Sequence, residues 1–200
     1  MTIIAFISQK GGVGKSTLAQ ALASEIKRQK KKILLADCDS QQATSYEWSK
    51  LNKKIPCQVF NSVSEVWPLS KDYDLIIIDG PARTSAGTLE IAKKADLLIQ
   101  PTGASRADLI PAIKEFNALK KAGINKQKLL FILNHIGSKT EEEIAHDYLK
   151  ETGYNFSPIS LYEKVSYRQT QNEGKSISEI SYKELRKKAK DLVASILDHL

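Results

Sequence analysis

The stretch ISQKGGVGKST, residues 7–17, constrains the fold of this chain more than any other part of the sequence. It lies between an apolar run at residues 3–7 and a segment rich in Leu and Ala at residues 18–23. Glycines let backbone N–H groups turn toward phosphate oxygens, and the N-terminus of a following helix adds partial positive charge. The stretch therefore predicts a phosphate-binding loop between a strand and a helix.

The residues after the last glycine favour a polyphosphate ligand over a plain glycine-rich turn. Lys15 can span β- and γ-phosphates, the Ser16 hydroxyl is placed to ligate Mg²⁺, and Thr17 can donate to an α-phosphate. The loop residues expected to contact the nucleotide are Gly11, Gly12, Val13, Gly14, Lys15, Ser16 and Thr17.

Apolar runs alternate with helical patterns along most of the chain. Strands are predicted at residues 2–8, 32–37, 57–60, 74–79, 96–100 and 128–134, with a weaker one at 155–159. Helices are predicted at residues 15–30, 41–54, 62–70, 85–95, 105–122, 140–152, 162–173 and 181–199. Continuous apolar runs such as 75–78 are typical of parallel strands covered on both faces. The chain is therefore expected to be α/β, with a doubly wound, mostly parallel sheet flanked by helices.

Length and composition suit one compact domain over residues 1–200, with 42% hydrophobic residues. Because the first strand begins at residue 2, we expect no N-terminal DNA-binding domain. No apolar run reaches the roughly 18 residues of a membrane span. The two cysteines, Cys38 and Cys57, have no motif spacing, which indicates reduced thiols in a cytosolic protein, and the three histidines have no metal-site spacing.

The formal net charge of +7 bears on the partner of the chain. Lysines gather at residues 27–32, 50–54, 120–128 and 183–190. Such groups are most often solvated helix faces, but an excess spread over several segments also attracts polyanions, nucleic acid first. Charge alone leaves both interpretations open.

Two strands end in aspartates that suit nucleotide chemistry. The segment KKILLADCDSQQ places Asp37 and Asp39 after one apolar run, and YDLIIIDGPAR places Asp79 after another. Carboxylates at the ends of neighbouring strands can hold the waters of a bound metal and orient an attacking water. We expect Asp79 to hold Mg²⁺ through a water, and Gly80 and Pro81 to begin a mobile switch loop.

The loop departs from the general pattern G-x-x-x-x-G-K-[ST], because its first position is Gln9 and an additional lysine, Lys10, lies four residues before Gly14. The sequence K-G-G-V-G-K-S-T resembles the deviant Walker A motif of the ParA/MinD family of ATPases. The resemblance implies that Lys10 reaches the nucleotide of a second subunit and that Lys15 acts within its own subunit. It also implies that Asp39 positions the hydrolytic water and that Asp37 supports the Mg²⁺ region.

Looser resemblances continue further along the chain. Pro101, Ser105 and Asp108 match a segment that lines the family's dimer face. By the same resemblance, Asn134 contacts adenine and Pro158 lies in a loop that walls the base. The overall pattern is most similar to the small plasmid-partition ATPases.

That resemblance implies an ATP-bound homodimer that requires Mg²⁺, binds DNA without sequence preference and releases it after slow hydrolysis. A small centromere-binding adaptor, similar to ParB or ParG, would stimulate hydrolysis, and the protein would be cytoplasmic and associated with the nucleoid, with no stable membrane association. The residues expected to face DNA are Lys164, Arg168, Arg186, Lys187, Lys188 and Lys190.

Three alternatives remain open at this point. A MinD-like membrane-positioning ATPase would need a C-terminal amphipathic anchor, and residues 192–200 carry apolar side chains at helical spacing, although such a stripe is more often core packing. A positioner of carboxysomes or other cargo would use the same chemistry. A metabolic kinase or ligase with a phosphate-binding loop would leave Lys10 without a purpose. The sequence does not identify the cargo or the partner.

Overall fold

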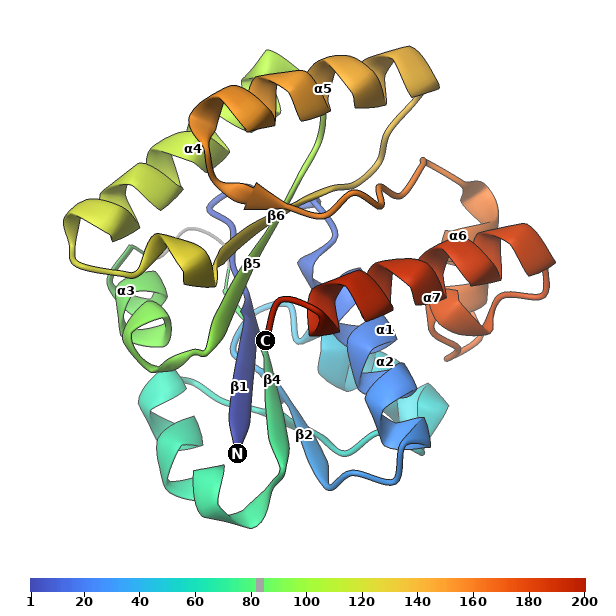
Figure 1. Ribbon diagram of the computed structural model, residues 1–200. Coiled ribbons are helices and arrows are strands. Elements are labelled where there is room, and N and C mark those ends of the chain that lie inside the picture. Colours follow the sequence, from blue (N-terminus) through green and yellow to red (C-terminus); the bar gives the residue numbers. More distant parts are fainter. Residues whose placement is uncertain (82–84) are drawn as a thin grey trace.

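The computed structural model describes residues 1–81 and 85–200, and it contains a seven-stranded parallel sheet in the order β3-β2-β4-β1-β5-β6-β7 (Figure 1). The strands are β1 (Thr2–Phe6), β2 (Ile33–Asp37), β3 (Cys57–Val59), β4 (Leu75–Asp79), β5 (Leu97–Thr102), β6 (Leu129–Leu133) and β7 (Asn155–Phe156). The expected α/β sheet flanked by helices is confirmed.

Helices cover both faces of the sheet (Figure 1). The α-helices are α1 (Lys15–Arg28), α2 (Thr44–Asn52), α3 (Ser85–Lys94), α4 (Arg106–Lys121), α5 (Lys139–Thr152), α6 (Val165–Asn172) and α7 (Lys183–Leu197). The 3-10 segments of the described residues are η1 (Val63–Asp72), η2 (Lys126–Lys128) and η3 (Ile177–Glu179). One face packs against α3, α4 and α5, and the other packs against α1, α2, α6 and α7.

The central strands are apolar on both sides because both faces are covered. In β1, Ile3 and Ala5 belong to the core under α3–α5, whereas Ile4 and Phe6 belong to the core under α1 and α7. All four side chains are buried. Successive strand residues point to opposite faces, so a two-sided core requires the continuous apolar runs seen in the sequence.

Two predicted elements differ from the structure. Residues 62–70 were expected to form an α-helix, but Val63–Asp72 is a 3-10 segment that contains Pro68, which has no backbone N–H to donate. The weak strand at 155–159 is reduced to Asn155–Phe156 at the edge of the sheet, paired with β6 only.

The parallel register brings the predicted acidic residues to one edge. Asp37 and Asp79 are direct neighbours across β2 and β4, and Phe6 pairs with Asp79 across β1 and β4. The carboxyl ends of these three strands therefore meet beside the loop that follows β1.

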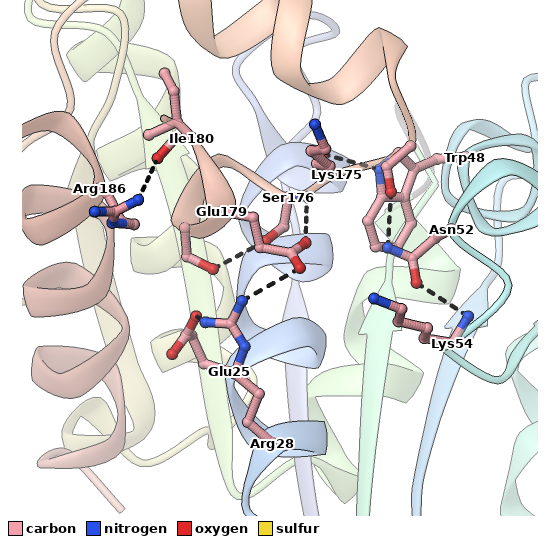
Figure 2. Close-up of polar contacts among 12 residues, drawn as sticks. Glu25, Arg28, Trp48, Asn52, Lys54, Lys175, Ser176, Glu179, Ile180 and Arg186 are labelled. Atoms are coloured by element: carbon pink, nitrogen blue, oxygen red, sulfur yellow. Dashed lines mark hydrogen bonds and ion pairs between the residues drawn. The ribbon is translucent and has the colours of Figure 1, made fainter. Parts of the chain in front are cut away.

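The C-terminal part of the chain contacts α1 and α2 through hydrogen bonds and ion pairs (Figure 2). The Trp48 indole donates to the carbonyl oxygen of Lys175, and Arg28 pairs with Glu179 of η3 at 3.2 Å. Leu192 and Ile196 of α7 are buried in the core, so these two residues of the C-terminal apolar stripe pack inside the protein. In the described ranges, 1–81 and 85–200, no helix has the length and hydropathy needed to cross a membrane.

Candidate functional site

A cavity of about 310 Å³ opens at the carboxyl edge of the sheet. It is lined by residues 11–12 and 14–17 of the glycine-rich loop and by residues at the ends of β2 and β4. The opposite side is formed by Asn134, His135 and residues 161–171. The cavity thus gathers segments that are more than one hundred residues apart in sequence.

Two glycines give the loop its shape. Gly12 and Gly14 have φ angles of 74° and 97°, which residues other than glycine rarely adopt. A Cβ atom on Gly14 would lie 2.0 Å from Nδ2 of Asn134. That amide nitrogen donates to the carbonyl oxygen of Val13 at 2.8 Å. Asn134, predicted to contact adenine, lines the cavity and braces the loop in this structure.

Lys15 and Asp79 form the charged centre of the cavity. Lys15 is the first residue of α1 and is buried, and this burial lowers its pKa although the charge of Asp79 opposes the shift. Burial, followed by the charge of Asp37, raises the pKa of Asp79 to about 6, whereas hydrogen bonds from Ser45 and Ser16 oppose that rise. Both charges are therefore poorly solvated in the free protein, and a ligand that carried charges and a cation would compensate them.

The carboxylate of Asp37 is hydrogen-bonded to backbone N–H groups in this structure. Its carboxylate accepts N–H groups of Ser45 at 2.9 Å and Tyr46 at 3.0 Å, at the start of α2, and of Asp39 at 3.1 Å. Burial raises its pKa, and these hydrogen bonds oppose the rise. Asp37 thus holds the loop after β2 in place, next to Asp79.

Ser45 is a site residue that the sequence analysis missed. It is fully buried, and its hydroxyl donates to Oδ2 of Asp79 at 2.7 Å. Its own N–H is bound by Asp37, so one residue links both aspartates. No motif marks this serine, because the contact depends on how α2 packs beside β4.

Asp39 lies on the wall of the cavity and is half-buried. Its Oδ1 accepts the N–H of Gln42 at 3.2 Å, and Gln42 also lines the cavity. The expected switch loop begins at Gly80, on the cavity wall, but its continuation through residues 82–84 lies outside the described residues.

Lys10 lies outside this cavity, on the far side of the loop. Its ammonium is paired with Asp108 in the first turn of α4, and its backbone N–H is bound by Ser8 Oγ at 3.1 Å. Burial disfavours the charge of Asp108, but hydrogen bonds from Lys10 and Ser105 outweigh it and lower the pKa of the carboxyl.

Glu115 of α4 is a second residue without a sequence signal. It is buried under the loop, where its Oε2 accepts the N–H of Gln9 at 3.3 Å and the amide of Gln100 at 2.6 Å. Its other oxygen and Oε1 of Gln100 are buried without a hydrogen-bond partner in the described part of the chain. Burial raises the pKa of Glu115.

Several residues in and near segment 161–171 lie at positions that differ from the predictions. Pro158 is exposed and does not line the cavity, which Tyr162 and Glu163 border instead. Lys164 and Arg168, predicted to face DNA, lie on the cavity wall, where Arg168 pairs with Glu163. Glu163 also contacts the ring of His135, and the sequence analysis assigned no role to either residue.

The remaining DNA candidates lie on α7, and three of these four residues are already engaged. Arg186 donates to the carbonyl oxygen of Ile180 at 3.2 Å (Figure 2), and Lys187 pairs with Asp191 at 2.6 Å. The ammonium of Lys188 lies 4.0 Å from the centre of the Tyr162 ring. Lys190 is exposed.

A nucleotide with a bound magnesium ion fits this cavity. Beside Gly11 and Gly12 there is open space, and the cavity volume lies at the lower end of the usual range for ligand sites. Within residues 1–81 and 85–200, no group of three His, Cys, Asp or Glu residues could hold a metal ion by itself. A magnesium ion held by Ser16 would take its other ligand oxygens from waters and phosphates.

Comparisons with known proteins agree with this geometry. Residues 4–177 match the family model described as the CobQ/CobB/MinD/ParA nucleotide binding domain. The chain is 30% identical over 139 residues to maintenance of carboxysome distribution protein A of Gloeobacter kilaueensis, covering 64% of this chain and 62% of that protein. The matched segment thus spans less than two thirds of that relative.

Two solved structures share the fold at low sequence identity. An ATP complex of McdA from Cyanothece has a TM-score of 0.75 and 22% identity, over 98% of this chain and 96% of the other. A putative plasmid partition protein from Borrelia burgdorferi B31, bound to AMPPNP, has a TM-score of 0.71 and 18% identity, over 100% of this chain and 99% of the other.

Proposed function

The chain belongs to the CobQ/CobB/MinD/ParA nucleotide-binding domain family, and we propose that it is a DNA-partition ATPase that binds DNA in its ATP-bound, dimeric form. The observation that carries this proposal is the pair of lysines on the two sides of one loop. Lys15 lies in the cavity, whereas Lys10 lies outside it with half of its side chain exposed. Lys15 would serve the chain's own nucleotide, and Lys10, once released from its ion pair with Asp108, would reach the nucleotide of a second copy.

Nucleotide binding would use the loop and the strand ends. Backbone N–H groups of residues 11–16 and the ammonium of Lys15 would bind the phosphates. Ser16 would ligate a magnesium ion, which supplies neutralisation of phosphate charge, and Asp79 would hold that ion through a water. The lowered pKa of Lys15 and the raised pKa of Asp79 support this assignment, because both charges gain partners when such a ligand binds.

Dimerisation would follow from charge. Two triphosphates brought toward one interface repel each other unless cations lie between them. Lys10 from each copy would supply that charge, and each charge-assisted contact contributes about 1.5–3 kcal/mol. The dimer would therefore form only with the triphosphate bound.

Hydrolysis would depend on Asp39, which lies on the cavity wall and would orient the attacking water. We expect slow turnover that a small centromere-binding adaptor of the ParB or ParG kind accelerates. Release of the terminal phosphate would remove the ligand that Lys10 of the other copy binds, and the dimer would then separate. The protein would thus associate with the nucleoid in its ATP form.

Sedimentation with plasmid DNA tests the proposal. We expect the wild type to co-sediment with plasmid DNA in ATP and Mg²⁺, and to remain in solution with ADP. The Lys10→Ala variant should bind ATP as a monomer but fail to dimerise and fail to co-sediment. Equal retention in ATP and ADP, or normal dimerisation of Lys10→Ala, would refute the proposed switch.

A second candidate is a cargo positioner, and one specific observation favours it. The relative that is 30% identical over 139 residues maintains carboxysome distribution according to its name. The same ATP-dependent dimer would then carry a cargo other than a DNA centromere. Adding candidate adaptors separately to the ATPase assay distinguishes the two functions, because only the true adaptor should accelerate turnover.

A further inference from the structure

Lysines precede every strand from β2 to β6, on the edge of the sheet opposite the nucleotide cavity. The exposed lysines of segments 30–32, 53–54 and 93–94, of position 71 and of segment 120–121 are here called the lysine rim. Because all strands are parallel, these segments meet at the amino-terminal edge. We propose that the lysine rim binds the phosphate backbone of duplex DNA. The choice of DNA as partner rests on the function proposed above.

The charge of the rim is little compensated. In the described residues, 1–81 and 85–200, no rim lysine takes part in an ion pair. Asp72, Asp74 and Asp96 lie on the same edge and carry negative charge. The carboxylates of Asp74 and Asp96 accept backbone N–H groups of Lys32 and Ile3, each at 2.8 Å, and the rim lysines outnumber the three carboxylates. Arg28, by contrast, is held by Glu25 and Glu179 (Figure 2) and is not counted in the rim.

Helix dipoles explain only part of this pattern. Lysines in the last turn of a helix compensate its negative end, as at the ends of α3 and α4. The effect falls off within that turn. Segments 30–32 and 53–54 lie beyond the ends of α1 and α2, and position 71 is in a 3-10 segment. The helix dipole therefore does not account for all of the rim lysines.

Two rim lysines have backbone conformations that glycine adopts more easily. Lys30 and Lys53 have φ angles of 62° and 56°, just after α1 and α2. Gly123, Gly153 and Gly174 have positive φ after α4, α5 and α6, so the chain does use glycine at other helix ends. Ala43 and His135 also have positive φ, so such positions are not reserved for glycine in this chain, and lysine at two of them adds two charges to one edge of the sheet.

The dimensions of the rim fit a duplex. From β3 to β6 the sheet has five strand spacings of about 4.8 Å, which gives about 24 Å, or about seven base pairs at 3.4 Å each. Lys10 lies at the opposite edge, so a copy that covers the nucleotide cavity leaves the rim exposed. A dimer would carry two rims, and two rims on long DNA bind more tightly than one.

The α7 lysines are the competing surface. Three of the four α7 residues predicted to face DNA contact other groups through an ion pair, a carbonyl oxygen or a ring. Among the rim lysines of the described residues, Lys32 has a ring contact, with Tyr73 at 5.4 Å, and none is in an ion pair. The rim is also independent of the nucleotide, so a single rim should bind a short duplex equally weakly with ADP and with ATP. Only the two rims of the ATP-bound dimer should hold the protein on long plasmid DNA.

Fluorescence anisotropy with a labelled 20-base-pair duplex, over a salt series, tests the proposal. The test variant is Lys30→Gly/Lys53→Gly, because glycine relieves the backbone at both sites and the protein should melt no lower than the wild type. We expect its affinity for the duplex at 50 mM salt to fall about tenfold and its salt slope to fall by about 2. The charge-matched control Lys114→Gln/Lys139→Gln, at exposed positions away from the rim, should behave like the wild type.

The competing surface is tested by Lys183→Gln/Lys190→Gln on α7. Loss of duplex binding in that variant, with the duplex affinity of Lys30→Gly/Lys53→Gly unchanged, would refute DNA binding by the lysine rim. A rim variant that loses binding only to vesicles of anionic lipid, and not to the duplex, would also overturn it. A different result would refute the proposed function alone. In that case the rim variant loses binding to the short duplex, but the wild type is retained on plasmid DNA equally in ATP and in ADP.

Discussion

The ammonium of Lys10 is paired with the carboxylate of Asp108, at the start of α4 of the same chain. The lysine that we propose to act in a second copy is thus folded back on its own subunit. Half of its side chain is exposed, whereas the side chain of Asp108 is 18% exposed. To reach another nucleotide, Lys10 must leave this ion pair, which therefore opposes dimerisation.

Replacing Asp108 should strengthen the ATP-dependent dimer. An exposed ion pair contributes up to about 1 kcal/mol, and two such pairs, one in each copy, must break per dimer, so Asp108→Asn should lower the dimer dissociation constant by no more than about 30-fold. Analytical ultracentrifugation at several concentrations measures this constant. Lys10→Ala is the control, because it should abolish dimerisation altogether. Weaker dimerisation in Asp108→Asn would show that Asp108 supports the dimer instead.

Replacing Asp39 should trap the ATP-bound dimer. A residue that orients or activates the water contributes typically about 10²–10⁴-fold to the rate, and Asp39→Ala should lose ATP turnover by at least about 10²-fold. Nucleotide binding should persist, because Asp39 is not expected to contact the phosphates. Phosphate release and sedimentation with ATP check both parts. Ser40→Ala, at the exposed neighbouring position, should turn over ATP like the wild type.

Replacing Ser45 should destabilise the protein through Asp79. The lost hydrogen bond at 2.7 Å leaves a buried carboxylate with one donor fewer, which costs about 2 kcal/mol. For a chain of this length, Tm should fall by about 4–8 °C. Ser49→Ala in the same helix is the matched control, because its hydroxyl donates to the carbonyl oxygen of Tyr46 and contacts no carboxylate in the described residues. An equal fall in both variants would contradict a specific role for Ser45.

Replacing Glu115 should stabilise the protein at neutral pH. Burial raises its pKa above the ordinary value of 4.5, so the folded state binds the proton more tightly than the unfolded state. The free energy of unfolding of the wild type therefore falls as pH rises from about 4.5 through the raised pKa, and it stays lower above that range. Glu115→Gln carries no charge and should not show this fall.

The measurement is thermal unfolding of both proteins from pH 4 to pH 8. Glu115→Gln should melt above the wild type at pH 7, and the two curves should meet at the acid end. The glutamine amide also supplies donors beside Gln100, whose Oε1 has no partner in the described residues. A Glu115→Gln variant that melts lower at pH 7 would contradict this account.

Local sequence patterns were sufficient for much of the fold. The continuous apolar runs predicted the strands because a sheet covered on both faces needs apolar side chains on both sides. The phosphate-binding loop was predicted from residues 7–17, because consecutive residues form it. The edge at which Asp37 and Asp79 meet followed from the parallel order of strands.

The tertiary structure decided the contacts of the site. Lys10 and Asp108 are 98 residues apart, Gln9 and Glu115 are 106 apart, and Ser45 and Asp79 are 34 apart. It also placed Arg168 on the cavity wall rather than on an outer face. Motifs record the spacing of neighbours along the chain, whereas these contacts depend on the order of strands and on how the helices pack over them. That is why the sequence by itself determined the loop and the sheet, and only the folded chain decided which side chains brace, restrain and enclose the nucleotide cavity.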